Sequence, residues 1–198
     1  SFLPPVSKEV GDRAVELIRQ AITECDPATA VRYAHFELGR QLMHAGRDAD
    51  AIETFQTLLE NADPTSVLVD EDGEQDKETA VAAYTLYGQA LAAVDRHDDA
   101  TSAFRDAASV DPENHMPMLN LGVYLRSRKE HEKSLTALKR AVELMGQMHP
   151  DVRVIRELGF TYLALERMQE AEETLFSVVE HFASRGNHDQ LDPTAAVA

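Results

Sequence analysis

The 198-residue sequence is short of several residue types, and each shortage narrows what the protein can do. A single cysteine, Cys25, excludes an internal disulfide bond and any metal site built only of cysteine, and it favours a reducing compartment. Lysine and arginine number 19 against 35 aspartate and glutamate residues, which gives a formal net charge of −16. So acidic a protein repels nucleic-acid phosphates and anionic lipids. We therefore expect neither nucleic-acid binding nor membrane docking as the main activity.

Long hydrophobic runs are absent as well. The most apolar stretch, residues 80–94, is too short and too mixed to cross a bilayer. The first residues, SFLPP, lack the basic start and apolar middle of a signal peptide, and no initiating methionine precedes them. We expect a cytoplasmic protein, with a periplasmic or membrane-tethered location as the alternative if the N-terminus was trimmed.

Four of the nine glycines mark an internal repeat. They are 49, 34 and 37 residues apart. A large residue comes three positions after each glycine, a small one twelve positions after it and a bulky apolar one sixteen positions after it. A pattern of this length indicates a helical-repeat architecture. The glycines are Gly39, Gly88, Gly122 and Gly159; the small residues are Ala51, Ala100, Ser134 and Ala171; the bulky ones are Phe55, Phe104, Leu138 and Leu175.

Each repeat is interpreted as a pair of antiparallel helices. A glycine inside the first helix costs about 1 kcal/mol relative to alanine, which is offset if another helix approaches closely there. The small residue of the second helix permits the same approach, and the bulky residue fills the remaining space. Polar turns at 46–48, 95–98 and 128–130 separate the two helices, and Asp63-Pro64 and Asp111-Pro112 end second helices.

This pattern resembles the tetratricopeptide repeat (TPR) family over about residues 29–183. The second repeat is the best match, with Ala100, Phe104 and Pro112 at the spacing of the family motif. The resemblance implies an all-α fold, a right-handed helical-repeat solenoid of stacked antiparallel helix pairs. It predicts repeats at about 32–65, 81–114, 115–148 and 152–185. The sequence departs from the motif where Ser134 replaces alanine and Leu175 replaces phenylalanine.

Three segments lie outside the repeats. Residues 1–28 contain one predicted helix at 7–27, either a cap on the first repeat or the remnant of a preceding one. The tail at 184–198 is predicted to be flexible. An acidic insertion at about 66–80 places Asp70, Asp72 and Asp76 around Gly73, but it lacks the late glutamate of a calcium-binding EF-hand loop. We interpret it as a solvated loop, with partner docking or a weak cation site as alternatives.

Residues for catalysis or cofactor binding are scarce. The sequence has no glycine-rich phosphate loop, and His131-Glu132 lacks the second histidine of a zinc-binding helix. Cys25 lies between Glu24 and Asp26, whose negative charges disfavour a reactive thiolate. We therefore expect no enzyme, no cofactor and no metal site.

The first helices of stacked pairs line the concave groove of a solenoid, where a partner peptide binds. In the frame of the resemblance, the groove positions hold four arginines, many apolar side chains and no carboxylate, and so favour an apolar peptide that carries acid. The alternative is that neighbouring helices cover some of them, or that Arg153 and Arg156 pair with Glu157 or another local acid. The predicted groove residues are Tyr33, Phe36, Arg40, Met43, Gln89, Met116, Leu119, Asn120, Val123, Arg126, Arg153, Arg156 and Phe160.

Some members of the family clamp the C-terminal carboxylate of heat-shock chaperones at fixed groove positions. In the last three repeats these positions hold Thr85, Gln89, Asn120, Arg153 and Glu157. Asn120 fits and Arg153 is an acceptable substitute, but Thr85 removes a charge and Glu157 reverses one. The resemblance therefore disfavours this particular clamp.

The leading interpretation is a non-enzymatic scaffold or adaptor that binds a partner peptide or helix in the groove. One alternative is a bacterial secretion-type chaperone, which is similar in size and charge but usually has three repeats. Others are a scaffold that self-assembles into homo-oligomers through the solenoid ends, and a regulatory region of a longer chain. Arginine outnumbers lysine by 14 to 5, which suits a GC-rich or salt-tolerant prokaryote.

Overall fold

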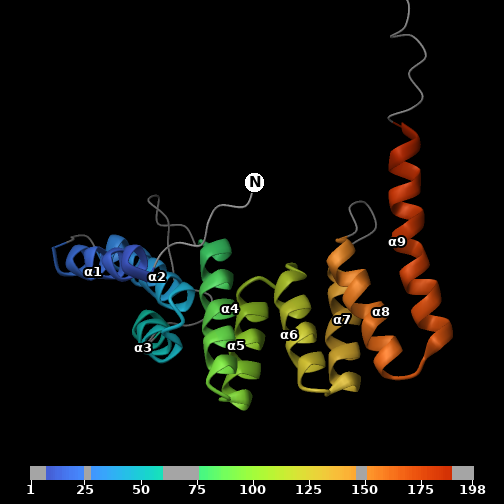
Figure 1. The fold of residues 1–198 in the computed structure, drawn as a ribbon, viewed down its shortest axis with the longest axis horizontal. Coiled ribbons are helices and arrows are strands. Elements are labelled where there is room, and N and C mark those ends of the chain that lie inside the picture. The colour runs from blue at the N-terminus through green and yellow to red at the C-terminus, as the bar shows by residue number, and fades with distance from the viewer. Residues whose placement is uncertain (1–7, 25–27, 60–75, 146–150, 189–198) are drawn as a thin grey trace, which may run out of the picture. The chain divides into compact units, whose positions relative to one another are not determined.

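The computed structural model describes residues 8–24, 28–59, 76–145 and 151–188. These ranges hold nine α-helices and no strand (Figure 1). Contacts divide the chain into two compact units, Ser1–Glu113 and Asn114–Ala198, here called the N-terminal and C-terminal units. The helices are α1 (Lys8–Glu24), α2 (Ala28–His44), α3 (Asp48–Leu59), α4 (Lys77–Ala93), α5 (His97–Val110), α6 (Met116–Ser127), α7 (His131–Met145), α8 (Val152–Ala164) and α9 (Met168–His188).

The helices form pairs, as the repeat pattern predicts. In the N-terminal unit α2 packs on α3 and α4 on α5, and in the C-terminal unit α6 packs on α7 and α8 on α9 (Figure 1). Successive pairs stack within each unit through α3 on α4 and through α7 on α8. The predicted turns at 46–48, 95–98 and 128–130 are confirmed, because first helices end and second helices begin there.

One turn geometry recurs in all four pairs. The residue seven positions after each repeat glycine has a positive φ: 70° at Gly46, 62° at Asp95 and Lys129, and 58° at Glu166. The N–H of the next residue then donates to the carbonyl five residues earlier, as from Arg47 to Leu42 at 2.9 Å. In each pair the left-handed residue ends the first helix, and the hydrogen bond from the following N–H helps to satisfy the last carbonyls of that helix.

The repeat glycines make the close approach that the sequence predicts. A Cβ atom at Gly39 would lie 2.6 Å from the Phe55 ring, and one at Gly159 would lie 2.5 Å from Leu175. At Gly88 the Phe104 ring is more distant, at 3.1 Å. Each glycine therefore accepts the bulky side chain sixteen positions later in its own pair, and that prediction is confirmed.

Fully buried side chains hold the N-terminal unit together. Phe55 and Phe104 fill the two helix pairs, and the Phe55 ring lies 6.4 Å from that of Tyr87, which joins α3 to α4. Val15 of α1 is buried, and α1 packs on α2. This placement suits both predicted origins of α1, a cap or the remnant of a repeat.

The C-terminal unit has its own core, with one polar addition. Leu135 and Leu138 of α7 pack with Val154 and Leu158 of α8. The hydroxyl of Ser134 donates to the carbonyl of Gly122 at 2.7 Å, and it is completely buried. The serine that departs from the family motif is thus accommodated by a backbone acceptor in the partner helix.

Two element ends differ from the expected boundaries. Asp76 caps α4, accepting from the Thr79 N–H at 2.9 Å, so residues 77–80 of the predicted insertion belong to that helix. Residues 66–75, including Asp70, Asp72 and Gly73, lie outside the described residues. At the other end α9 continues to His188, beyond residue 183, and 189–198 again lie outside the description.

Candidate functional site

The thirteen predicted groove residues lie on first helices, as expected. Five of them are on α2 and α4 in the N-terminal unit, and eight are on α6 and α8 in the C-terminal unit. The two sets differ in how exposed their side chains are and in how many of them pair with local residues.

In the N-terminal unit the predicted residues are largely engaged. The Tyr33 hydroxyl donates to Asp76 Oδ2 at 2.5 Å, and Arg40 forms an ion pair with Glu37 at 2.7 Å. Phe36 and Met43 are half-buried. The Arg40 charge is therefore neutralised locally, and this set offers little exposed apolar surface to a partner.

On α6 and α8 the C-terminal unit exposes three large apolar side chains. Val123 of α6 is 36% exposed, and Phe160 and Leu163 of α8 are 42% and 39% exposed. Phe160 and Leu163 are three residues apart and share a face of α8. Together with Arg126 and Arg156 they form what we call the α6–α8 face.

A buried carboxylate lies beneath this face, beside the predicted groove positions. Glu157 is 7% exposed and accepts a hydrogen bond from Arg126 Nη2 of α6 at 2.5 Å. Arg156, its neighbour on α8, donates to the other Glu157 oxygen from Nη2 at 3.1 Å. The alternative that Arg156 pairs with Glu157 is confirmed. Burial of Glu157 is tolerated because two guanidinium groups hold it.

This cluster carries one net positive charge, two from arginine and one negative from Glu157. Arg126 also stacks on Phe160, with its guanidinium carbon 5.9 Å from the ring centroid. The buried Nε of Arg126 has no hydrogen-bond partner in the structure. Donor capacity toward a partner therefore rests on Arg156, whose side chain is 53% exposed, and not on this buried atom.

A second charged group joins the starts of α6 and α8. The Asp151 carboxylate caps α8, accepting from the Arg153 N–H at 2.9 Å, and it lies 3.2 Å from His115 Nε2. The Arg153 guanidinium donates to it at 2.6 Å. These hydrogen bonds, led by that guanidinium, hold the pKa of Asp151 well below its usual value. Arg153 pairs with a local acid, so it contributes no net charge to a binding surface.

One predicted groove residue points inward. Leu119 is 4% exposed and packs with Val154 and Leu158 in the core of the C-terminal unit. The expectation that it lines an open surface is therefore wrong, because α8 covers that side of α6. Met116 is half-buried against the same cluster, and Asn120 is half-buried.

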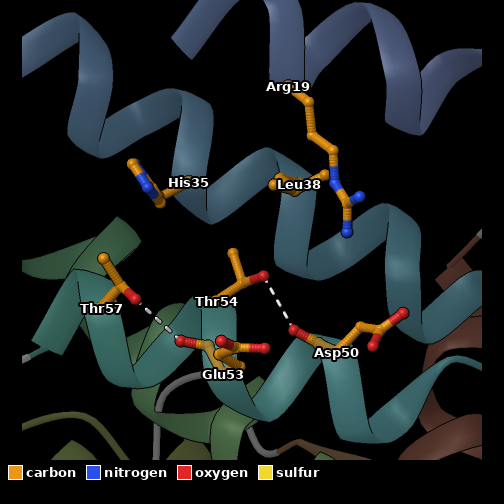
Figure 2. A pocket seen from close by; sticks show the side chains of 7 residues that line it. All are labelled: Arg19, His35, Leu38, Asp50, Glu53, Thr54 and Thr57. Carbon is orange, nitrogen blue, oxygen red and sulfur yellow. Dashed lines mark hydrogen bonds between the residues drawn. The ribbon is translucent and has the colours of Figure 1, made fainter. Parts of the chain in front are cut away.

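The N-terminal unit also has a hollow of about 230 Å³, which the sequence analysis missed (Figure 2). It lies among α1, α2 and α3, so no linear motif marks it. Arg19 extends from α1 on one side, and Asp50 and Glu53 of α3 face it from the other (Figure 2). The hydroxyls of Thr54 and Thr57 donate to backbone carbonyls of α3, at 2.8 and 3.0 Å. With opposite charges and no enclosed apolar surface, the hollow has none of the features of a cofactor site.

The described residues offer no support for metal binding. Among them, no three or more histidine, cysteine, aspartate or glutamate side chains gather in a way that could hold an ion. No helix in the described ranges is both long and apolar enough to span a membrane.

Comparison with known proteins matches this architecture. A crystal structure of MamA is 20% identical, with a TM-score of 0.69 and coverage of 91% of this chain and 93% of that one. MamA 41-end from Desulfovibrio magneticus RS-1 is 17% identical, with a TM-score of 0.65 and coverage of 88% and 87%. Kinesin light chain TPR-like repeats from Podosopora anserina are 15% identical, with a TM-score of 0.68 and coverage of 90% of each chain. No curated protein sequence matches.

These similarities to solved structures, all below 25% identity, show the fold, and they confirm the predicted all-α class of stacked antiparallel helix pairs. The family is shown by sequence. The tetratricopeptide repeat family model matches residues 11–66 and 85–152, which is more than half of the chain. The chain belongs to the tetratricopeptide repeat family.

Proposed function

We propose that this protein is a non-enzymatic scaffold or adaptor that binds a partner segment on the α6–α8 face. The segment carries an apolar side chain next to a carboxylate. Tetratricopeptide repeats generally mediate protein–protein interaction, which supports a protein as the partner. The observation that carries the proposal is the exposed Phe160 ring beside the Arg126–Glu157–Arg156 cluster.

Charge supports an acidic partner at this surface. The protein carries −16 overall, yet the cluster has two guanidinium groups against one carboxylate. The Arg156 side chain is 53% exposed, so it can donate to a second carboxylate without releasing Glu157. A guanidinium that is already held in place loses little freedom on binding, which favours a bidentate contact with the partner.

The apolar part of the face supplies the anchor. Val123, Phe160 and Leu163 are exposed on adjacent helices, and such partly open apolar surface is typical of recognition sites. Aromatic and arginine side chains are also the residues that dominate binding energies at protein interfaces. An extended or helical segment can place one apolar side chain against Phe160 and its acid against Arg156. We propose the cytoplasm as the compartment in which this binding occurs.

The test compares two variants in a pull-down from the lysate of the source cell. The double variant Arg156→Gln/Phe160→Ser removes the free donor and the anchor, and Arg126 still holds Glu157. The control Arg140→Gln removes an exposed arginine of α7 that is paired with Glu143 at 2.9 Å. We expect the wild type and the control to recover the same partner, and the double variant to lose it.

Binding of the recovered partner is then measured with purified proteins. We expect the double variant to bind about tenfold or more weakly, because both an arginine and an aromatic contact are lost. Equal affinities for wild type and double variant would contradict the proposal and place the partner on another surface. Arg126 is left unchanged because its removal would strip a buried carboxylate of its partner on α6.

A further inference from the structure

The apolar side of helix α9 is broad, and only part of it is covered within the fold. Ala171 is buried and Leu175 packs on Gly159, so one face covers α8. Next to that face Met168, Phe176 and Val179 are 61%, 58% and 60% exposed. Phe176 comes eight residues after Met168, and Val179 comes three residues after Phe176, so the three side chains follow one stripe of the helix. Within the C-terminal unit α9 lies outermost, with α8 between it and α7 (Figure 1).

Only Val179 in this stripe belongs to the surface that each second helix turns toward the following repeat. The position of Val179 is apolar in the other second helices too, and its equivalent Val142 packs against the core shared with α8. Two further positions differ. Where the other three second helices carry polar residues, α9 carries Met168 and Phe176. The equivalents of Phe176 are Gln56, Arg105 and Lys139, and those of Met168 are Asp48, His97 and His131.

Carboxylates accompany the stripe. Glu172 lies one turn after Met168 and one turn before Phe176, on the same side of α9, and it is exposed. Glu173 is exposed next to it and accepts a hydrogen bond from Gln169 at 3.1 Å. Within the described residues neither glutamate belongs to an ion pair, whereas Glu170 is paired with Arg167. The stripe therefore combines apolar anchors with uncompensated negative charge.

We propose that this stripe of α9 docks a basic amphipathic helix of a partner protein. The apolar side chains of the partner pack on Met168, Phe176 and Val179, and a lysine or arginine among them pairs with Glu172. Helix-on-helix packing suits a regular stripe of this spacing, because side chains of one helix fit between those of the other. The exposed glutamates favour a partner of opposite charge over one that is acidic.

Two other occupants fit the charge less well. A second copy of the chain brings a charge of −16 of its own and the same glutamates. Residues 189–198 contain two aspartates and no lysine or arginine. Both would place like charges together, which weakens association at moderate ionic strength.

The test starts from a display library of helical peptides of about 20 residues. Peptides are selected on the wild-type protein alone, and the test variant Phe176→Gln installs the side chain found at the equivalent position of α3. The affinities of the leading peptides are measured by fluorescence anisotropy for wild type, Phe176→Gln and Glu172→Lys. The matched control is Phe160→Ser, which removes an exposed aromatic side chain from the α6–α8 face.

We expect the selected peptides to place lysine or arginine within an apolar stripe. Their affinity should fall about tenfold or more in Phe176→Gln and in Glu172→Lys and stay within about twofold in Phe160→Ser. Selected peptides that are neutral or acidic would overturn the proposal. Peptides that bind the Phe160→Ser variant more weakly but the Phe176→Gln variant as tightly as wild type would also overturn the proposal.

Two more measurements address the other occupants. Sedimentation equilibrium of wild type and Phe176→Gln should show a monomer in both, and an oligomer that Phe176→Gln dissociates would assign the stripe to a second copy. Removal of residues 189–198 should leave peptide affinity unchanged. A gain of about tenfold on removal would show that the chain covers its own stripe, and it would overturn the proposal.

Discussion

A Cβ atom placed on Gly122 would lie 2.5 Å from Cγ of Leu138, the side chain sixteen positions later in the same helix pair. No real side chain tolerates that separation, so α6 and α7 pack closely only because residue 122 has no side chain. Leu138 is completely buried and cannot swing aside into solvent. The same relationship holds between Gly159 and Leu175 and between Gly39 and Phe55.

Replacement of Gly122 by alanine should therefore destabilise the protein. We expect the free energy of unfolding to fall by about 1–3 kcal/mol in urea titrations, because overpacking outweighs the gain in helix propensity. Gly88→Ala is the matched control, since the Phe104 ring lies 3.1 Å from its Cβ position and would have to shift by a smaller distance, so the cost should be smaller. A Gly122→Ala variant as stable as the wild type would show that the two helices do not pack at this distance.

Substitutions at the turn residues with positive φ test the conformational preference of the backbone separately from side-chain packing. Lys129→Gly and Glu166→Gly should each stabilise the protein by about 0.5–1 kcal/mol, because a side chain disfavours positive φ. Gly46→Ala should destabilise it by about 1 kcal/mol, although a Cβ there would meet no atom within 4 Å. Thermal and urea unfolding would measure these differences. Opposite signs would mean that these residues do not adopt left-handed backbone in solution.

The carboxylate of Asp151 should make stability depend on pH. Its folded pKa lies below the usual 3.8, mainly because the Arg153 guanidinium hydrogen-bonds to it. A group with a lowered pKa stabilises the fold above its unfolded pKa, and that stabilisation is lost as the pH falls below 3.8 toward the folded value. Asp151→Asn keeps a capping side chain but removes the charge. We expect it to be less stable than wild type near neutral pH.

The comparison is made by thermal unfolding across this pH range. The difference between wild type and Asp151→Asn should shrink as the pH falls from about 5 to 3. The exposed carboxylate of Glu113, which lies outside the helices, provides the control as Glu113→Gln. A difference that stays constant with pH would mean that the hydrogen bonds of the Asp151 carboxylate do not persist in solution.

The two arginines on Glu157 should differ in their effect on stability. Arg126 reaches Glu157 from α6 and its side chain is 32% exposed, whereas Arg156 is 53% exposed. Arg126→Ala should lower the free energy of unfolding by about 1–3 kcal/mol, because it leaves a buried carboxylate without its partner on the other helix. Arg156→Ala should cost less. Equal costs in urea titrations would show that Glu157 is more hydrated in solution than its 7% exposure indicates.

The groove residues show that a repeat position predicts the helix on which a residue lies but not how deeply the residue is buried. The position three residues before the repeat glycine holds Phe36, Leu119 and Arg156 in the first, third and fourth repeats. Phe36 is half-buried, Leu119 is buried and Arg156 is exposed. The offset places all three on first helices. Burial differs because α8 covers α6 at Leu119, whereas in the described residues no later first helix covers α8.

The helix pairs, the turns between them and the match of each glycine to a bulky partner follow from the spacing of residues along the chain. These features depend on contacts within one repeat, where fixed spacing along the chain becomes fixed spacing in space. Three other features became visible only in the packed molecule: Arg126 of α6 holds Glu157 of α8, Leu119 turns inward and α9 leaves Phe176 exposed. Those features depend on which helices pack side by side, and the same residue type is buried or exposed according to that neighbour.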